Sequence, residues 1–190
     1  MAMKLPASVL AALEAQSAKV ERKRLVRVLG IDTSLRSTGL GVIEADGSSM
    51  KYIDCRPVKN PAAWTLSACL LNLSNTLEAY LAEFTPDEVA VEGIFFCKNA
   101  KTALLLGHAR GTLISVCAKA ALPVYEYPPT RIKQAVTGTG TATKEQIQRM
   151  MMRCLNLDSL PQEDAGDALA IAITHLHSRS NIAALAPKRL

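Results

Sequence analysis

Residues 26–56 read VRVLGIDTSLRSTGLGVIEADGSSMKYIDCR, and this stretch decides the fold class. An apolar run ends at Asp32, and two further segments, residues 39–44 and 50–56, are interpreted as strands. Between the last two lies Asp46-Gly47, a pair that is typical of a tight hairpin turn. The stretch therefore predicts an antiparallel meander of three strands.

The chain beyond this meander alternates helices with strands. Leucines recur at steps of three and four residues from Leu66 to Leu81, which predicts a helix. The apolar segment 89–96 predicts a central strand, and a short strand is expected at 123–127. The remaining helices are expected at 99–121, 130–136, 143–156 and 161–178, the third of these opened by a capping box of Thr143 and Gln146. This order predicts an α/β fold with a five-stranded mixed sheet flanked by helices.

Length and composition indicate one globular domain between two basic ends. The chain has 190 residues, of which 49% are hydrophobic and 21% charged, and no apolar run is long enough to span a membrane. Basic residues outnumber acidic ones in an N-terminal extension, 1–24, expected to be helical or mobile, and in a C-terminal tail, 179–190. The domain itself is expected at 25–178. Five cysteines without a C-x-x-C pair favour reduced thiols and a cytoplasmic protein.

Four carboxylates occur where the sequence otherwise indicates a buried core. Asp32 ends the first strand, Glu92 lies in the central strand, and Asp164 and Asp167 lie three apart on one face of the last helix. A buried carboxylate is costly unless it is paired or binds a cation. Oxygen ligands without a Cys or His cluster favour Mg²⁺ or Mn²⁺, and two such ions can clamp the attacking and leaving oxygens of a phosphodiester.

Six motifs in one order make the chain similar to bacterial RuvC-type Holliday junction resolvases. The resemblance covers about residues 26–178. Its motifs are VLGIDTSLRSTG at 28–39, VEGIFFCKNA at 91–100, LGHARG at 106–111, PVYEY at 123–127, RIKQ at 131–134 with GTGTATK at 138–144, and DAGDALAIAITH at 164–175.

This resemblance implies a ribonuclease H-like nuclease domain at 25–178 and a homodimer that acts on four-way junction DNA. It implies paired symmetric nicks in recombination and repair, with 5′-phosphate products. It also implies two Mg²⁺ ions per active site, for which Mn²⁺ substitutes, held by the four carboxylates named above. A branch-migration helicase complex of the RuvA–RuvB type stays open as a partner, and no membrane partner is expected.

The resemblance and the residue types also indicate which side chains meet DNA. Phe95 matches the aromatic residue that stacks into the opened junction, and Lys133 and Lys144 match lysines that meet DNA near the cut. Lys144 begins a helix behind a glycine-bearing loop, where it is expected to assist the reaction at the scissile phosphate. Lys98 and Arg110 are expected phosphate contacts, although a solvated helix face explains them equally well.

Two departures from the family pattern leave the cut-sequence preference open. Thr33-Ser34 stand where the family usually has Pro-Gly, and Gly93 stands where Gln is common, which is expected to widen the site. The alternatives are a related nuclease for other branched or flap DNA, and a non-catalytic junction-binding protein. An ATP-binding protein of the sugar kinase and actin class is a weaker alternative, because that fold needs two such domains.

Overall fold

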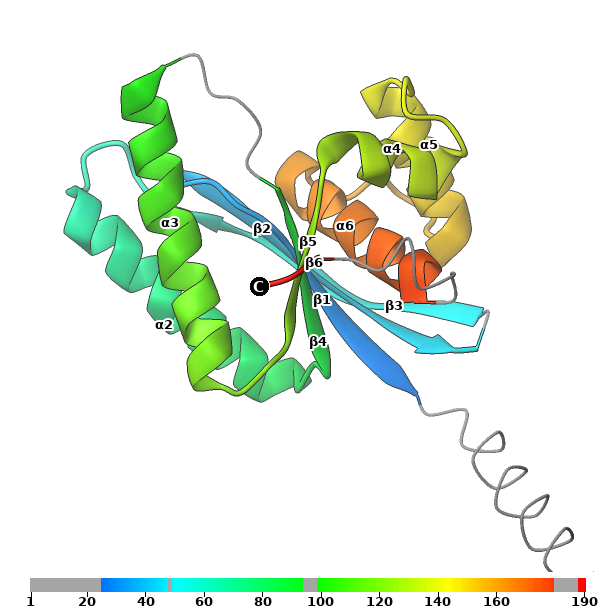
Figure 1. Ribbon diagram of the computed structural model, residues 1–190, viewed down its shortest axis with the longest axis horizontal. Helices are drawn as coiled ribbons and strands as arrows, with labels where there is room; N and C mark the ends of the chain where they lie inside the picture. Colours follow the sequence, from blue (N-terminus) through cyan, green and yellow to red (C-terminus); the bar gives the residue numbers. More distant parts are fainter. Residues whose placement is uncertain (1–24, 48, 94–98, 180–187) are drawn as a thin grey trace, which may run out of the picture.

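A mixed six-stranded sheet forms the centre of the protein, as seen in the computed structural model (Figure 1). The structure describes residues 25–47, 49–93, 99–179 and 188–190. The strands are β1 (Val26–Asp32), β2 (Ser37–Asp46), β3 (Ser49–Lys59), β4 (Glu88–Glu92), β5 (Val124–Tyr127) and β6 (Lys188–Arg189). The helices are α2 (Leu66–Phe84), α3 (Ala100–Lys119), α4 (Pro129–Thr137), α5 (Lys144–Leu155) and α6 (Glu163–Arg179). No helix within these ranges is long and apolar enough to cross a membrane.

The sheet order is β3-β2-β1-β4-β5-β6, so the meander lies on one side of a parallel centre. β1 pairs antiparallel with β2 and parallel with β4, and β4 pairs parallel with β5. This confirms the predicted meander and mixed sheet. The strand count differs from the predicted five, because Lys188 and Arg189 in the predicted tail pair antiparallel with β5. The predicted strand 89–96 ends earlier, since β4 stops at Glu92.

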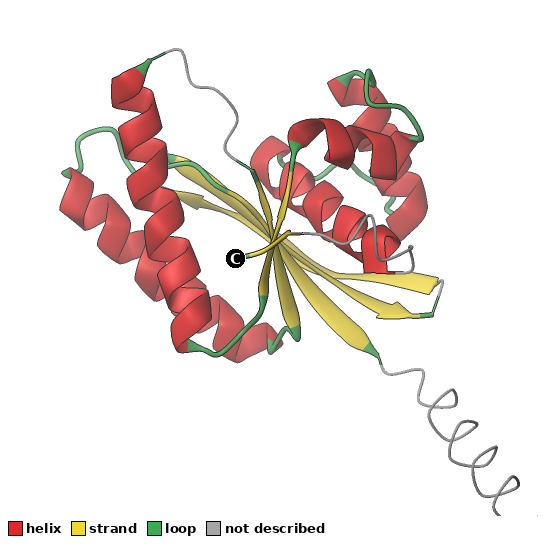
Figure 2. Cartoon of the chain, in the orientation of Figure 1, coloured by secondary structure: helices red, strands yellow, loops and turns green. Residues whose placement is uncertain are grey.

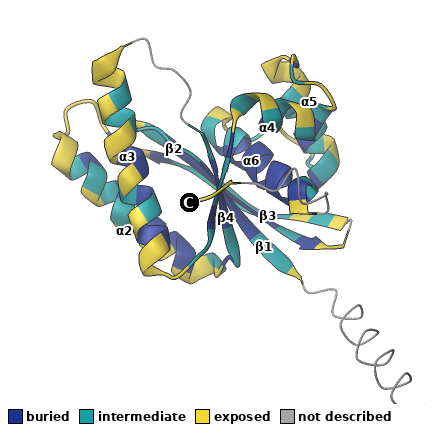
Figure 3. Cartoon of the chain, viewed as in Figure 1, coloured by how far each residue is buried: buried dark blue, intermediate teal, exposed yellow. Residues whose placement is uncertain are grey.

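Helices cover both faces of the sheet, with α2 and α3 on one face and α4, α5 and α6 on the other (Figure 2). Apolar side chains fill both layers. The buried residues run along the strands and the helix faces that turn toward the sheet (Figure 3). The predicted capping box is confirmed, because the Thr143 hydroxyl accepts from the Gln146 amide and the Gln146 side chain accepts from the Thr143 amide. The structure thus begins α5 at Lys144, one residue after the cap.

α6 packs against β1 and β2 more closely than side chains usually allow. A Cβ atom added to Gly30 would lie 1.9 Å from the Ala168 carbonyl oxygen, and one added to Gly39 would lie 1.9 Å from the Asp164 carbonyl oxygen. Only glycine permits this approach. It presses the first turns of α6 against the end of the sheet where Asp32 pairs with Gly39.

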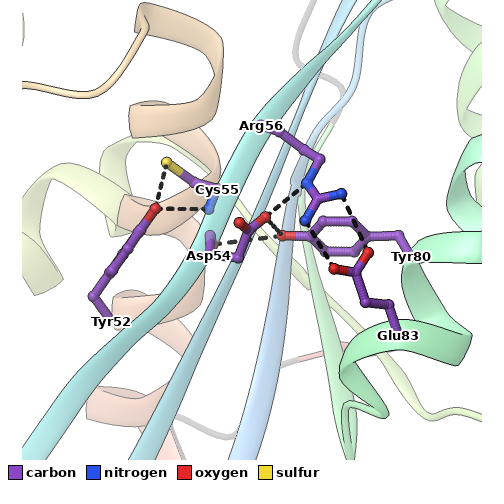
Figure 4. A network of polar contacts seen from close by, with 6 residues as sticks. All are labelled: Tyr52, Asp54, Cys55, Arg56, Tyr80 and Glu83. Carbon is purple, nitrogen blue, oxygen red and sulfur yellow. Dashed lines mark hydrogen bonds and ion pairs between the residues drawn. The ribbon is translucent and has the colours of Figure 1, made fainter.

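On the face of the sheet that lies away from α6, a polar network connects the edge strand β3 to α2 (Figure 4). Arg56 donates from Nε to Asp54 at 2.8 Å and from both terminal nitrogens to Glu83 at 3.2 Å. The Tyr80 hydroxyl also donates to Asp54 at 3.0 Å, and the Arg56 guanidinium lies 4.9 Å from the Tyr80 ring centroid. A bidentate guanidinium that also stacks on an aromatic ring fixes orientation better than an isolated surface ion pair.

Candidate active site

Two strands and one helix bring the predicted carboxylates to one end of the sheet. Asp32 is the last residue of β1 and Glu92 is the last residue of β4. These strands are parallel neighbours with Ile31 opposite Val91, so their final side chains lie at the same end of the sheet, where the carboxyl ends of both strands meet. α6 contributes Asp167 to the same place.

A cavity of about 270 Å³ lies at this edge. Its charged lining comprises Asp32, Glu92, Asp167, Lys133 and Lys144. The other lining residues are apolar and come from α4, α5 and α6, namely Pro129, Ile132, Ile147, Ala170 and Ile171. Three of the four predicted carboxylates and two of the three predicted lysines, Lys133 and Lys144, therefore share one cavity.

The negative charges in this cavity oppose one another. Burial, and then the charges of Asp167, Glu92 and Asp164, raise the pKa of Asp32 to about 7, although Lys144 counteracts them. Burial and then the charge of Asp167 raise the pKa of Glu92, although the positive charges of Arg110 and Lys133 counteract them. Burial also raises the pKa of Asp167, with Lys144 counteracting it. Such a group of carboxylates favours a cation among them.

Within the described residues, Lys144 forms the ion pair that involves one of these carboxylates. Its Nζ lies 2.9 Å from Asp167 and also forms an ion pair with Glu163. Burial lowers the pKa of Lys144, but its hydrogen bonds to Glu163 and Asp167 outweigh burial and raise the pKa above the usual range. The side chain is therefore a fixed positive charge and cannot serve as a proton acceptor at neutral pH.

Asp164 lies beside the cavity and does not line it. The Ser37 hydroxyl, at the start of β2, donates a hydrogen bond to the Asp164 carboxylate. Asp164 is one turn before Asp167 on α6, and its charge still raises the pKa of Asp32. Within the described ranges, no three His, Cys, Asp or Glu side chains already stand together as a metal site.

Arg110 is placed differently from the prediction. Only 9% of its side chain is exposed, and the guanidinium donates to the Glu92 carbonyl oxygen and to Glu126. The Arg110 guanidinium therefore does not make the predicted phosphate contact at the surface, because both of its terminal nitrogens already donate to other groups of the protein. Phe95 and Lys98 belong to residues 94–98 and lie outside the described residues.

The two departures from the family pattern have local consequences that the sequence did not indicate. The turn at Thr33-Ser34 is closed by Thr38, whose hydroxyl donates to the Ser34 carbonyl oxygen and accepts from the Ser34 amide. Gly93 does not line the cavity as expected. A Cβ atom there would lie 3.4 Å from Cγ of Glu126, an ordinary van der Waals contact, so Gly93 lies beside Glu126.

Sequence reasoning missed Ser37, Glu126 and Glu163, which bind Asp164, Arg110 and Lys144 respectively. Ser37 carried a weak signal, since it is a polar residue at the start of a strand that pairs with the Asp32 strand. Glu126 also carried one, because it interrupts the apolar pattern of PVYEY directly beside the central strand. Glu163 is exposed near a helix start, where acidic residues are common, and carried none.

Comparison with known proteins agrees with this geometry. Residues 28–175 match the family model described as Crossover junction endodeoxyribonuclease RuvC. The chain is 45% identical to the crossover junction endodeoxyribonuclease RuvC of Pelobacter propionicus over 153 residues, covering 80% of this chain and 87% of that protein. It is also 45% identical to the Chloroflexus aggregans protein of the same name over 154 residues, covering 80% and 94%.

A solved structure of Thermus thermophilus RuvC in complex with a Holliday junction substrate has the same fold. It superposes with a TM-score of 0.81 and 31% sequence identity, covering 87% of this chain and 99% of that chain. A second structure of the Thermus thermophilus protein gives a TM-score of 0.78. The predicted ribonuclease H-like fold and endonuclease class are confirmed, and the chain belongs to the RuvC family of crossover junction endodeoxyribonucleases.

Proposed function

We propose that this protein resolves four-way DNA junctions by paired symmetric nicks, using Mg²⁺ held by Asp32, Glu92, Asp164 and Asp167. Endonuclease action at crossover junctions follows from the family. The observation that carries the assignment of residues is the cavity at the end of β1 and β4, where burial and then the neighbouring carboxylates raise the pKa of Asp32 to about 7. We assign the nuclease domain to residues 25–178.

The residues present fit a hard divalent cation, which the family implies as a cofactor. All donors are carboxylate oxygens, the ligand type that Mg²⁺ and Mn²⁺ prefer. Thr33, next to Asp32, has a buried hydroxyl without a hydrogen-bond partner among the described residues, as expected where a solvated ligand supplies the partner. We propose two Mg²⁺ ions per site, for which Mn²⁺ substitutes; when bound, they supply an activated water and neutralise charge on the phosphate.

The side chains of the chain itself then have distinct tasks. The carboxylates hold the ions and orient the attacking water. Lys144, fixed in its charged form, offsets the charge that develops on the scissile phosphate, a kind of contribution commonly worth about 10²–10³ in rate. For this it must exchange its contact with Asp167 for the phosphate, and the same exchange frees Asp167 to bind an ion. The 3′ oxygen leaves, and the 5′ phosphate remains on the product.

The junction is proposed to lie across the α4 and α5 side of the cavity. Lys133 lines the cavity and contacts a phosphate near the cut. Arg149 and Arg153 line a second cavity on α5, and neither forms an ion pair with another described residue. Phe95 and Lys98 follow Glu92 in the chain, and we propose that Phe95 stacks on an unpaired base, worth roughly 1–3 kcal/mol, with Lys98 on a phosphate.

Two copies are needed to make two nicks, and the exposed face of α3 supports a homodimer. Leu104 is 65% exposed there, and a Cβ atom at Gly107 or Gly111 would meet nothing within 4 Å. An exposed leucine beside small residues suits close packing of a second helix. A two-fold dimer would match a two-fold symmetric junction. We further propose a cytoplasmic location and a branch-migration complex of the RuvA–RuvB type as partner.

Cleavage of synthetic DNA tests this proposal. The purified protein is incubated with a mobile four-way junction, a duplex, a flap and a Y-shaped DNA, each with Mg²⁺, Mn²⁺ or Ca²⁺. We expect symmetric nicks with 5′-phosphate ends on the junction alone, with Mg²⁺ or Mn²⁺. Preferential cutting of the flap would favour a related nuclease for other branched DNA, and binding without cutting in every metal would favour a junction-binding protein.

A further inference from the structure

An ion pair inside the protein lies directly behind the proposed catalytic carboxylate of Glu92. Arg110 on α3 donates from one terminal nitrogen to the main-chain carbonyl oxygen of Glu92 and from the other to Oε1 of Glu126, at 2.5 Å each. The Arg110 side chain is 9% exposed and that of Glu126 is 22% exposed. Arg110 does not line the active-site cavity; it contacts the main chain of Glu92, and its charge also acts on the Glu92 carboxylate.

A second contact holds the same short stretch of main chain from the neighbouring strand. The Gly93 amide donates to the Tyr127 carbonyl oxygen at 2.8 Å, one residue after the last β4–β5 pair, Glu92 with Tyr127. Glu126 packs beside Gly93, with its Cγ 3.4 Å from the position that a Cβ would take. The main chain at the end of β4 is thus held from α3 and from β5 at once.

β4 ends at Glu92, and the strand pairing with β5 that fixes the position of its main chain ends at the same residue. A carbonyl oxygen at a strand end has no further partner in the sheet, and a buried one must find a donor elsewhere. The planar guanidinium supplies that donor and is itself oriented by the second arm of its fork on Glu126. Outer partners of this kind commonly set the orientation of groups that bind a metal ion.

We propose that Arg110, oriented by Glu126, is a positioning residue that sets the Glu92 carboxylate for ion binding. This inference depends on the proposed metal site. It makes a specific claim about the chain: the Arg110 fork acts on ion affinity and on the rate of cutting, and has no part in holding DNA. Glu126 acts through Arg110, so loss of either partner should disturb the same property.

The test compares Arg110→Met and Arg110→Lys with the unaltered full-length protein. Mn²⁺ binding is measured by calorimetry in the absence of DNA, cleavage is measured on the four-way junction with Mg²⁺, and junction affinity is measured with Ca²⁺. Removing an outer partner of a metal ligand commonly costs about 10- to 100-fold in affinity or activity. We expect losses of about that size in Mn²⁺ affinity and cleavage rate for Arg110→Met, smaller losses for Arg110→Lys, and unchanged junction affinity for both.

Arg27→Met is the matched control, because Arg27 makes the same kinds of contact at the other end of the sheet. It pairs with Glu44 at 2.8 Å and donates to the Phe84 carbonyl oxygen at 3.1 Å. We expect a lower melting temperature and normal Mn²⁺ affinity. If Arg27→Met lowers Mn²⁺ affinity as much as Arg110→Met does, the effect is general destabilisation and the inference is wrong.

Glu126→Gln keeps the inference testable where Arg110→Met does not fold. It should weaken Mn²⁺ binding in the same direction, and adding it to Arg110→Lys should cost less than the product of the two separate losses, because both act through one fork. Normal Mn²⁺ affinity in folded Glu126→Gln and Arg110→Lys proteins would overturn the inference. Failure of the unaltered protein to bind Mn²⁺ would instead count against the proposed function.

Discussion

Without metal, the protein should lose stability as the pH rises toward neutrality, and Asp32→Asn should recover much of that loss. Burial, followed by the charges of Asp167, Glu92 and Asp164, raises the pKa of Asp32 from 3.8 to about 7. Between these values the folded protein holds a proton that the unfolded chain has released. The stability that this bound proton contributes is therefore fully present below pH 3.8 and is lost as the pH rises to about 7.

The size of this effect follows from the two pKa values. Each pKa unit corresponds to about 1.4 kcal/mol, so ionising Asp32 in the folded protein costs up to about 4 kcal/mol. Asparagine has nearly the same shape and carries no charge. In EDTA at about pH 8, we therefore expect Asp32→Asn to be more stable than the unaltered protein by as much as that amount, while its cutting is abolished.

Urea unfolding at a series of pH values from about 4 to 8 measures this prediction. Asp46→Asn is the control, because Asp46 is an exposed carboxylate at the far end of β2. Mg²⁺ should stabilise the unaltered protein at about pH 8 and should stabilise Asp32→Asn less. The reasoning is refuted if Asp32→Asn in EDTA is no more stable than the unaltered protein and keeps the same dependence on pH.

Four further predictions concern the site, the DNA contact, the extension and the packing of α6. Asp167→Asn should abolish cutting while junction binding in a gel-shift assay persists, and unchanged cutting would contradict a role in ion binding. Phe95→Ala should slow cutting of an intact junction more than that of a nicked, flexible one, whereas equal losses would argue against stacking in an opened junction. Deletion of residues 1–24 should leave the cleavage rate unchanged, and a truncated protein that folds but does not cut DNA would show that the extension takes part in cleavage. Gly39→Ala should lower stability to urea by about 1–3 kcal/mol or more, because its Cβ would lie 1.9 Å from the Asp164 carbonyl oxygen, while Gly140→Ala meets nothing nearer than 3.6 Å and should cost less than Gly39→Ala.

Features that depend on neighbouring residues could be predicted well from the sequence. The turn at Asp46-Gly47 and the capping box of Thr143 and Gln146 need only local hydrogen bonds and backbone preferences, and both lie where the patterns indicated. Asp32 and Glu92 were also predictable as a pair, because an acidic residue in an apolar strand is expensive and needs a partner. Parallel pairing of their strands then places them together.

Features that depend on distant packing could not be predicted in the same way. Arginine is usually a surface residue, and only the approach of α3 to the ends of β4 and β5 gives Arg110 two partly buried partners. The two-residue strand β6 is too short to have a pattern, and its place is set by pairing with Glu126 and Tyr125. The end of β4 was placed too late, since β4 ends at Glu92 and Gly93 is outside it; residues 94–96 of the predicted strand lie outside the described residues.

The same helix supplies both the buried core and two of the acids, and this explains why the site and the fold are hard to separate. α6 buries nearly all of its residues from Ala168 to Leu176 and presses against glycine positions on β1 and β2. That contact holds the helix start, with Asp164 and Asp167, at the end of the sheet where Asp32 emerges. The energy of apolar packing along the helix offsets the repulsion among the carboxylates at its start. Apolar packing can therefore hold the main chain of these acids at this end of the sheet without an ion, whereas ion binding as proposed also requires the Asp167 side chain to leave Lys144.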